Sequence, residues 1–222
     1  MHSIKLPIFK ILELKRGIFL DRPNRFISKI KYKDKTELAH IHDPRRLKEL
    51  LIPGKEILFT SSKGKLKYYV KAVKSDNEWV LIDTSLHSRI ALKLFEYLPD
   101  FSKIKEIKKE VSIGKSRIDF HLDGVPLEVK GVTLVKNGIA LFPDAPIERG
   151  TRHVQEIINH NGKLLFLIFR NALKFGPNYK IDPKFSSKLI EARKSNIPII
   201  TAQIIFDGNI LYYNGKVPLL DF

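Results

Sequence analysis

Cysteine is absent from this 222-residue chain, which also has only one methionine and one tryptophan. Without cysteine the protein has no disulfide framework and no thiolate metal site, so any bound metal needs carboxylates, histidines or backbone oxygens as ligands. Disulfides are typical of oxidising compartments, and their absence favours a reducing one. We therefore expect a cytoplasmic protein.

Long hydrophobic runs are also missing. The first twenty residues are interrupted by charged residues and a proline, and they lack the apolar core of a signal peptide. The longest apolar run, Leu164 to Phe169, is far shorter than the ~20 residues that cross a bilayer. The sequence therefore predicts neither an export signal nor a membrane span.

Acidic residues are scarce relative to basic ones. The chain has 40 Lys and Arg against 24 Asp and Glu, a net charge of +16. Residues 1–82 are the more basic part, with 19 Lys and Arg against 9 Asp and Glu. Because a strongly basic surface attracts polyanions, we expect DNA or RNA as the partner and no membrane.

The hydrophobic pattern changes near residue 83, and we expect a domain boundary between residues 82 and 83. Residues 1–82 show short alternating runs between turn-rich pieces, with one short helix expected over Pro44–Leu51. This pattern predicts a small OB-like β-barrel, a fold common among nucleic-acid binders. The most distinct expected strands are Phe26–Tyr32, Lys55–Thr60, Lys65–Val73 and Glu78–Ile82.

Residues 83–222 change to mixed helices and strands. Their predicted order is αβββαβ with additions, an α/β layered domain, so that the whole chain combines α+β and α/β features. The expected helices are Ser85–Leu98, Glu148–His160 and Pro183–Ser195. The expected strands are Ile104–Ile113, Ser116–Leu122, Pro126–Leu134, Leu164–Phe169, Pro198–Phe206 and Ile210–Tyr213.

The segment from Ser116 to Lys130 reads as two strands joined by Asp123-Gly124, a strong signal for a two-residue hairpin. If Leu122 faces Val125, then Asp119 faces Glu128. Because side chains alternate along a strand, Arg117 and Lys130 share the face of these carboxylates, and apolar residues form the opposite face. The apolar residues are Ile118, Phe120, Leu127 and Val129.

Two facing carboxylates repel each other, and a hard cation between them relieves that repulsion. Mg²⁺ takes one or two carboxylates together with waters and phosphate oxygens, so Asp119 and Glu128 are a candidate site for Mg²⁺ or Mn²⁺. Lys130 is placed to stabilise charge on a phosphate, and Glu110 on the preceding strand is a further candidate ligand. The alternative is a solvated ion-pair cluster on an exposed sheet face.

Asp119 followed by Glu128-Val129-Lys130 resembles the PD-(D/E)xK nuclease motif. Longer segments resemble the sugar fermentation stimulation protein family, and the similarity covers nearly the whole chain. The segments are Glu110–Phe120, Glu128–Leu134, Phe142–His153, Arg25-Phe26, His42–Leu51 with Pro53-Gly54, and Ile181–Pro183.

This resemblance implies an OB-like N-terminal domain, a PD-(D/E)xK nuclease-like C-terminal domain and DNA binding, with a regulatory role in sugar metabolism as one reading. It assigns metal-ligand and lysine roles to Asp119, Glu128 and Lys130. The chain departs from the family at Arg45, where glycine is usual, and at Ile147, where threonine is usual. The first adds charge to a loop that could touch DNA, and the second puts a helix N-cap role in doubt.

Further nucleic-acid candidates are residues in turns, at a helix start and on one strand face. The strand set has a spacing near the phosphate repeat, although lysines that protect a strand edge from aggregation explain it equally well. For His40 and His42, a structural or DNA-contacting role is favoured over a metal site. The candidates are Arg16, Arg22, Arg25, Arg45, Arg46, Lys63, Lys65, Lys67, Tyr69 as a base-stacking ring, Arg117, Arg149, Arg152 and His153.

Two functional hypotheses follow. The first is a largely sequence-nonspecific DNA-binding protein with a divalent-metal-dependent nuclease site. The second is a non-enzymatic DNA-binding regulator of sugar metabolism that retains a vestigial nuclease fold. A basic protein bound to ribosomes or anionic membrane leaves the carboxylate hairpin unexplained.

Overall fold

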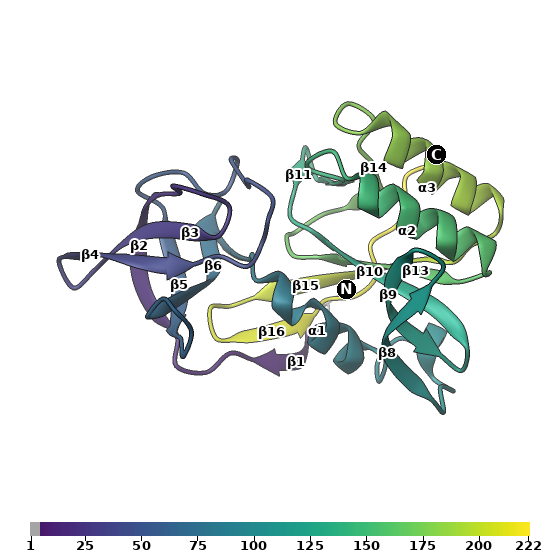
Figure 1. Ribbon diagram of the computed structural model, residues 1–222, viewed down its shortest axis with the longest axis horizontal. Helices are drawn as coiled ribbons and strands as arrows, with labels where there is room; N and C mark the ends of the chain where they lie inside the picture. Colours follow the sequence, from purple (N-terminus) through teal and green to yellow (C-terminus); the bar gives the residue numbers. More distant parts are fainter. Residues whose placement is uncertain (1–4) are drawn as a thin grey trace.

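The computed structural model describes residues 5–222, which form two lobes joined by a central group of strands (Figure 1). The first lobe is a closed five-stranded barrel with the strand order β4-β3-β2-β5-β6, and β4 pairs with β6 to close the ring. Its strands are β2 (Lys15–Asp21), β3 (Ile27–Tyr32), β4 (Lys35–His40), β5 (Glu56–Ser61) and β6 (Tyr68–Ser75). The predicted small barrel is confirmed.

Two local predictions in the barrel lobe are wrong. Pro44–Leu51 forms a loop with one hydrogen-bonded turn instead of a helix, because Leu47 adopts a positive φ of 49° that a right-handed helix does not allow. The predicted strand from Lys65 begins only at Tyr68, and the preceding residues form a bend. Lys63, Lys65 and Lys67 therefore lie in a loop and do not share one strand face.

The second lobe keeps the predicted αβββαβ order and adds elements before, within and after it. The six core elements are α1 (His87–Leu94), β8 (Ile107–Ile113), β9 (Ser116–Leu122), β10 (Val125–Val132), α2 (Glu148–Asn159) and β13 (Lys163–Ile168). The additions are α3 (Pro183–Lys194), β15 (Ile199–Phe206), β16 (Ile210–Tyr213), the short helices Thr84–Leu86 and Pro99–Phe101, and a small sheet of β11 (Val135–Lys136), β12 (Ile139–Phe142) and β14 (Lys174–Pro177).

The main sheet of this lobe is covered on both faces. Alternate residues of β13 pack into two different hydrophobic clusters, one with α1 and the other with α2 and α3. The parallel pairing of β10 with β13, and of β13 with β15, suits a sheet enclosed by helices. β10 is therefore a central strand, and its polar side chains lie under α2. Among residues 5–222, no helix has both the length and the apolar character needed to cross a membrane.

The lobes are also connected through paired strands. β7 (Glu78–Leu81) follows the barrel and pairs with both β6 and β15. β1 (Leu6–Lys10), although first in the chain, pairs with β16 of the second lobe. Figure 1 shows β1, β16 and β15 side by side between the two lobes.

Candidate metal and nucleic-acid site

The hairpin of β9 and β10 has the predicted register. Asp123 and Gly124 both have positive φ, 51° and 84°, as the favoured two-residue hairpin turn requires. The ladder then pairs Leu122 with Val125 and continues to Phe120 opposite Leu127. Beyond that pair no further ladder pair is formed between the two strands.

At the next position along the two strands, the side chain of Asp119 forms a hydrogen bond where a backbone pair would otherwise continue the ladder. Its Oδ2 accepts a hydrogen bond from the Val129 backbone N–H at 2.8 Å. The carboxylate is thereby held beside Glu128, as the register predicted. Of the four predicted apolar residues, all are buried, but Ile118 packs in the α2 and α3 cluster while the other three pack on the α1 side.

Glu128 is 2% exposed, although it lies on a face that the sequence pattern read as charged. Its Oε1 contacts His153 Nδ1 of α2 at 2.5 Å and also accepts from Lys130 Nζ. Its Oε2 is buried and has no hydrogen-bond partner in the described part of the chain. The alternative of a solvated ion-pair cluster is therefore correct in the pairing of Glu128 with Lys130 but wrong in its exposure, because α2 covers this face.

His153 is held from both sides of its ring. Arg149 Nε donates to His153 Nε2 at 3.2 Å, so that nitrogen is an acceptor. Consequently the ring proton is on Nδ1 and is donated to Glu128. His153 is buried, so the predicted role of a surface phosphate contact is corrected to a partner of the carboxylate.

The two carboxylates have opposite pKa shifts. Burial, and then the charge of Glu128, raise the pKa of Asp119 to about 6. For Glu128 burial alone would raise the pKa, but Lys130 and His153 outweigh it and lower the pKa. Above pH 6 both side chains are mainly ionised, so the pair carries more negative charge than Lys130 can balance.

Asp119→Asn should stabilise the metal-free protein at pH 7.5 by about 1–3 kcal/mol. Because the folded-state pKa of Asp119 is raised to about 6, the wild-type protein loses stability as pH rises from about 4 to above 6. Asparagine keeps the acceptor for the Val129 N–H and removes the charge. Thermal melts in EDTA at pH 7.5 should show a higher melting temperature for the variant than for the wild type, and the difference should shrink at pH 4.5. Equal melting temperatures of the variant and the wild type at pH 7.5 contradict the prediction.

A pocket of about 660 Å³ lies between the lobes, and the carboxylate pair is in its wall. We call it the interdomain pocket. The second lobe contributes the carboxylate pair, Lys130 and the start of α2. The barrel lobe contributes the two loops that carry Arg25 and Arg45. Its polar lining residues are Arg25, Asp43, Arg45, Thr84, His87, Arg117, Asp119, Glu128, Lys130, Glu148, Arg149 and His153.

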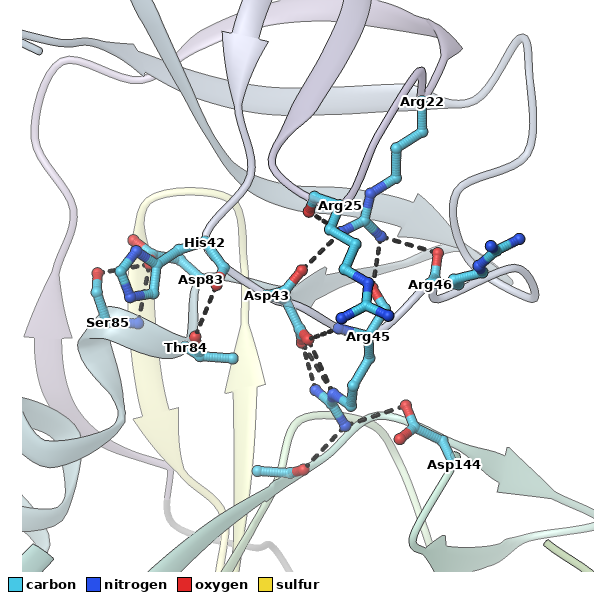
Figure 2. Close-up of polar contacts among 11 residues, drawn as sticks. Arg22, Arg25, His42, Asp43, Arg45, Arg46, Asp83, Thr84, Ser85 and Asp144 are labelled. Atoms are coloured by element: carbon cyan, nitrogen blue, oxygen red, sulfur yellow. Dashed lines mark hydrogen bonds and ion pairs between the residues drawn. The ribbon is translucent and has the colours of Figure 1, made fainter. Parts of the chain in front are cut away.

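Arg45 joins the lobes across this pocket. Its guanidinium bonds Asp43 at 2.5 Å, Asp144 at 3.0 Å and the Gly131 carbonyl at 3.4 Å. Figure 2 shows Arg45 reaching from the barrel lobe to Asp144. Burial alone would lower the pKa of Arg45, but both carboxylates raise it. The predicted DNA contact for Arg45 is therefore corrected, since its charge is already paired.

Arg22 is also a structural residue. Its two terminal nitrogens donate to four backbone carbonyls, which leaves neither of them free for a phosphate. Figure 2 shows this guanidinium at the centre of the loops that enclose Asp43. The four acceptors are the carbonyls of Arg25, Asp43, Arg45 and Arg46.

The other residues predicted to contact nucleic acid differ in their exposure and in whether they already have partners. Arg25 and Arg46 are exposed and form no ion pair within residues 5–222. Arg16 is exposed and lies over the Trp79 ring. Arg152 Nε donates to Ser116 Oγ at 3.3 Å, and the Tyr69 hydroxyl is bound to Asp83 at 2.7 Å.

Glu110 is not brought into a metal cluster. Its carboxylate accepts from Arg117, and both side chains are well exposed. Within residues 5–222, no three His, Asp or Glu side chains are arranged to hold a metal. The prediction of Glu110 as a further ligand is corrected, and Arg117 lies in the pocket wall as one half of this ion pair.

The sequence reasoning missed His87 and the importance of Gly131. A Cβ added to Gly131 would lie 2.1 Å from the His87 ring, so only glycine fits beside it. Burial, and then the charge of Arg45, lower the pKa of His87 to about 4, so the ring is neutral at pH 7. The glycine directly after Lys130 was the available signal.

Ile147 at the N-cap of α2 makes no side-chain cap bond, as its identity predicted.

Comparisons with known proteins cover both lobes. Residues 20–82 match the model of the SfsA N-terminal OB domain, and residues 85–209 match that of the sugar fermentation stimulation protein RE domain. The chain is 40% identical over 209 residues to the sugar fermentation stimulation protein homolog of Methanothermobacter thermautotrophicus, covering 87% of each chain. It is 40% identical over 222 residues to the homolog of Saccharolobus solfataricus, covering 95% of this chain and 89% of that one.

A solved structure gives the same result for the fold. The structure of Pyrococcus furiosus SfsA in complex with Ca²⁺ is similar with a TM-score of 0.90 and 28% sequence identity. The similarity covers 97% of this chain and 100% of that chain. The first lobe is an OB domain, and the chain belongs to the sugar fermentation stimulation protein family.

Proposed function

We propose that this protein is a divalent-metal-dependent phosphodiesterase that acts on nucleic acid. The observation that carries the proposal is the pair of half-buried Asp119 and buried Glu128 in the wall of a pocket lined with cations. A fold keeps two adjacent carboxylates away from bulk water at a cost in stability, and that cost is relieved when a cation binds.

The residues present fit a hard cation. Glu128 Oε2 is a buried acceptor without a partner among the described residues, and the bond from the Val129 N–H uses Oδ2 of Asp119 rather than Oδ1. Two carboxylate ligands are enough for Mg²⁺ or Mn²⁺, which complete their coordination with waters and phosphate oxygens. The related protein of Pyrococcus furiosus was solved in complex with Ca²⁺, another hard cation that prefers oxygen ligands.

The surrounding groups suit a phosphodiester. Lys130 Nζ beside Glu128 can move to a phosphate oxygen as charge develops there. Arg149 and the uncapped backbone N–H groups at the start of α2 also line the pocket, and a helix N-terminus attracts anions. When bound, the metal would lower the pKa of a water and polarise the phosphate.

The arrangement supports the PD-(D/E)xK reading in its order of elements. Asp119 lies on β9, Glu128 and Lys130 lie on β10, and α2 follows and covers them. His153 adds a contact that holds Glu128 in place from α2. The net charge of +16 and the OB domain supply a largely sequence-independent grip on DNA.

A cleavage assay tests the proposal. Purified protein with Mg²⁺ or Mn²⁺ should cut labelled duplex, nicked, branched or single-stranded DNA, or RNA, and EDTA should stop it. Asp119→Ala and Lys130→Ala should abolish cutting but spare binding measured in EDTA. Because binding releases counterions, affinity should fall steeply as salt rises from 50 to 200 mM, by about 10³-fold or more if six phosphates are contacted.

One observation favours the non-enzymatic alternative. Lys130 and His153 both bond Oε1 of Glu128, so part of its charge is already balanced without a metal. A DNA-binding regulator with a vestigial site would bind DNA with the same salt dependence. It would leave every substrate uncut with either metal, and that result would overturn the enzymatic proposal.

A further inference from the structure

A group of aromatic rings lies on the barrel where β3, β4 and β6 begin or end. Phe26 is 51% exposed, and its ring is nearly parallel to that of His40, with 6.4 Å between ring centroids. His42 is exposed, and its ring meets the ring of His40 edge-on at 5.8 Å. We call Phe26, His40 and His42 the aromatic platform.

Tyr69 supports the platform from below. It faces His40 across the β4–β6 pairing, and its ring lies 5.2 Å from that of His40 and 6.2 Å from that of His42. Its hydroxyl is fixed by Asp83 and Ser85, so this ring cannot move freely. The platform therefore rests on a rigid base, which reduces the ordering cost when a ligand stacks on it.

The platform is continuous with the interdomain pocket. Phe26 directly follows Arg25, and His42 directly precedes Asp43; both of these neighbours line the pocket. Thr84, another lining residue, donates to the His42 carbonyl at 3.4 Å. A chain that lies on the platform can therefore continue toward Glu128.

A second, smaller pocket of about 420 Å³ adjoins this surface and is lined by cations. Arg25 lines both pockets, and Arg46 and Lys48 complete the basic wall. All three are exposed, and within residues 5–222 none forms an ion pair with a carboxylate. Exposed aromatic rings beside unpaired cations match the alternating bases and phosphates of a nucleic acid.

We infer that the aromatic platform binds the unpaired bases of a single-stranded nucleic acid and leads that strand to Glu128. The inference deepens the proposed function and rests on it for the reaction at the pocket. Bases in a duplex are stacked on each other and cannot offer their faces, whereas unpaired bases can stack on Phe26 and His42. Burial, and then the charge of His42, lower the pKa of His40, so His40 is a neutral ring at pH 7.

The test measures binding without cleavage. The full-length protein in EDTA is titrated into fluorescein-labelled 20-nucleotide single-stranded DNA, single-stranded RNA and duplex DNA, and the anisotropy is followed. Single strands should bind at least tenfold tighter than the duplex. The variant Phe26→Ala with His42→Ala should lose about 10- to 100-fold in affinity for single strands and little for the duplex, since unpaired bases lose the rings on which they stack.

A matched control distinguishes stacking from a general loss of surface. Tyr179 is 45% exposed, a value close to that of Phe26, and it lies beside α3 in the second lobe. Tyr179→Ala should bind single strands as the wild type does. Phe26→Trp should preserve affinity, and the tryptophan fluorescence should be quenched when a strand binds.

The outcomes separate this inference from the proposed function. Equal affinity of the double variant and the wild type for single strands, or a preference for duplex, overturns the inference even if cleavage is found. Selective binding of single strands through Phe26 and His42 supports it even if no metal permits cleavage. A tenfold difference in affinity between single-stranded DNA and single-stranded RNA would show which of the two is the natural ligand.

Discussion

Glu128→Gln should lower metal-dependent cleavage by about 10²–10³-fold or more. Glutamine has the same shape and keeps an oxygen that can accept the Nδ1 proton of His153, so the contact with α2 is preserved. It removes the charge of the carboxylate whose Oε2 has no partner in the described part of the chain, and with it the attraction for a divalent cation. Initial rates over a range of Mg²⁺ concentrations measure the loss.

Glu110→Gln is the matched control. Glu110 is an exposed carboxylate on the neighbouring strand, and it forms an ion pair with Arg117. Its variant should cleave at a rate close to that of the wild type. Cleavage by the Glu128→Gln variant at the wild-type rate would place the active site elsewhere in the chain, and equal losses in both variants would point to general electrostatics.

Arg45→Ala should destabilise the protein by about 3–5 kcal/mol. The side chain of Asp43 is 0% exposed and that of Asp144 is 5% exposed, so removal of the guanidinium leaves two buried charges without their cation. For a chain of this length, each kcal/mol corresponds to about 2–4 °C in melting temperature. Differential scanning calorimetry should therefore show a fall of about 6–20 °C.

Arg46→Ala provides the control for this measurement. Arg46 is the next residue in the chain, but its side chain is exposed and unpaired within residues 5–222. Its variant should melt within about 2 °C of the wild type. Asp43→Asn with Asp144→Asn should recover much of the stability of Arg45→Ala, because it removes the uncompensated charges; melting of Arg45→Ala like the wild type would refute the pairing argument.

The hairpin could be predicted from the sequence because its determinants are local. Asp123 and Gly124 favour the turn, the turn sets the register, and the register brings Asp119 beside Glu128. The αβββαβ order follows from hydrophobic periodicity for the same reason. β11 has only two residues, too few to show a period, and neither it nor β12 was predicted.

The burial of Glu128 could not be predicted from its strand. An alternating pattern with charges on one face is typical of a solvated sheet, but α2 follows about twenty residues later and covers that face. The burial is therefore a tertiary effect. It explains why the ion-pair alternative is wrong about the exposure of Glu128, although the pair with Lys130 is present.

The roles of Arg22 and Arg45 were assigned incorrectly for a related reason. Arginines in turns are typical phosphate contacts, but these two bind partners that local sequence does not reveal. Asp144 is 99 residues from Arg45 in the chain. Arg25 and Arg46, in the same loops, are exposed and form no ion pair with any residue from 5 to 222, as a phosphate contact requires.

The pairing of β1 with β16 limits how the OB domain can move. The chain leaves the second lobe through β1, forms the barrel, and returns through β7, which pairs with β15. The barrel is thus tethered at both its entry and its exit by strands of one continuous sheet, and a free swing about a single linker is not available to it. A strand of nucleic acid would have to pass between two lobes whose separation is almost fixed. The width between the lobes, rather than a closing motion, would then determine which nucleic acids fit.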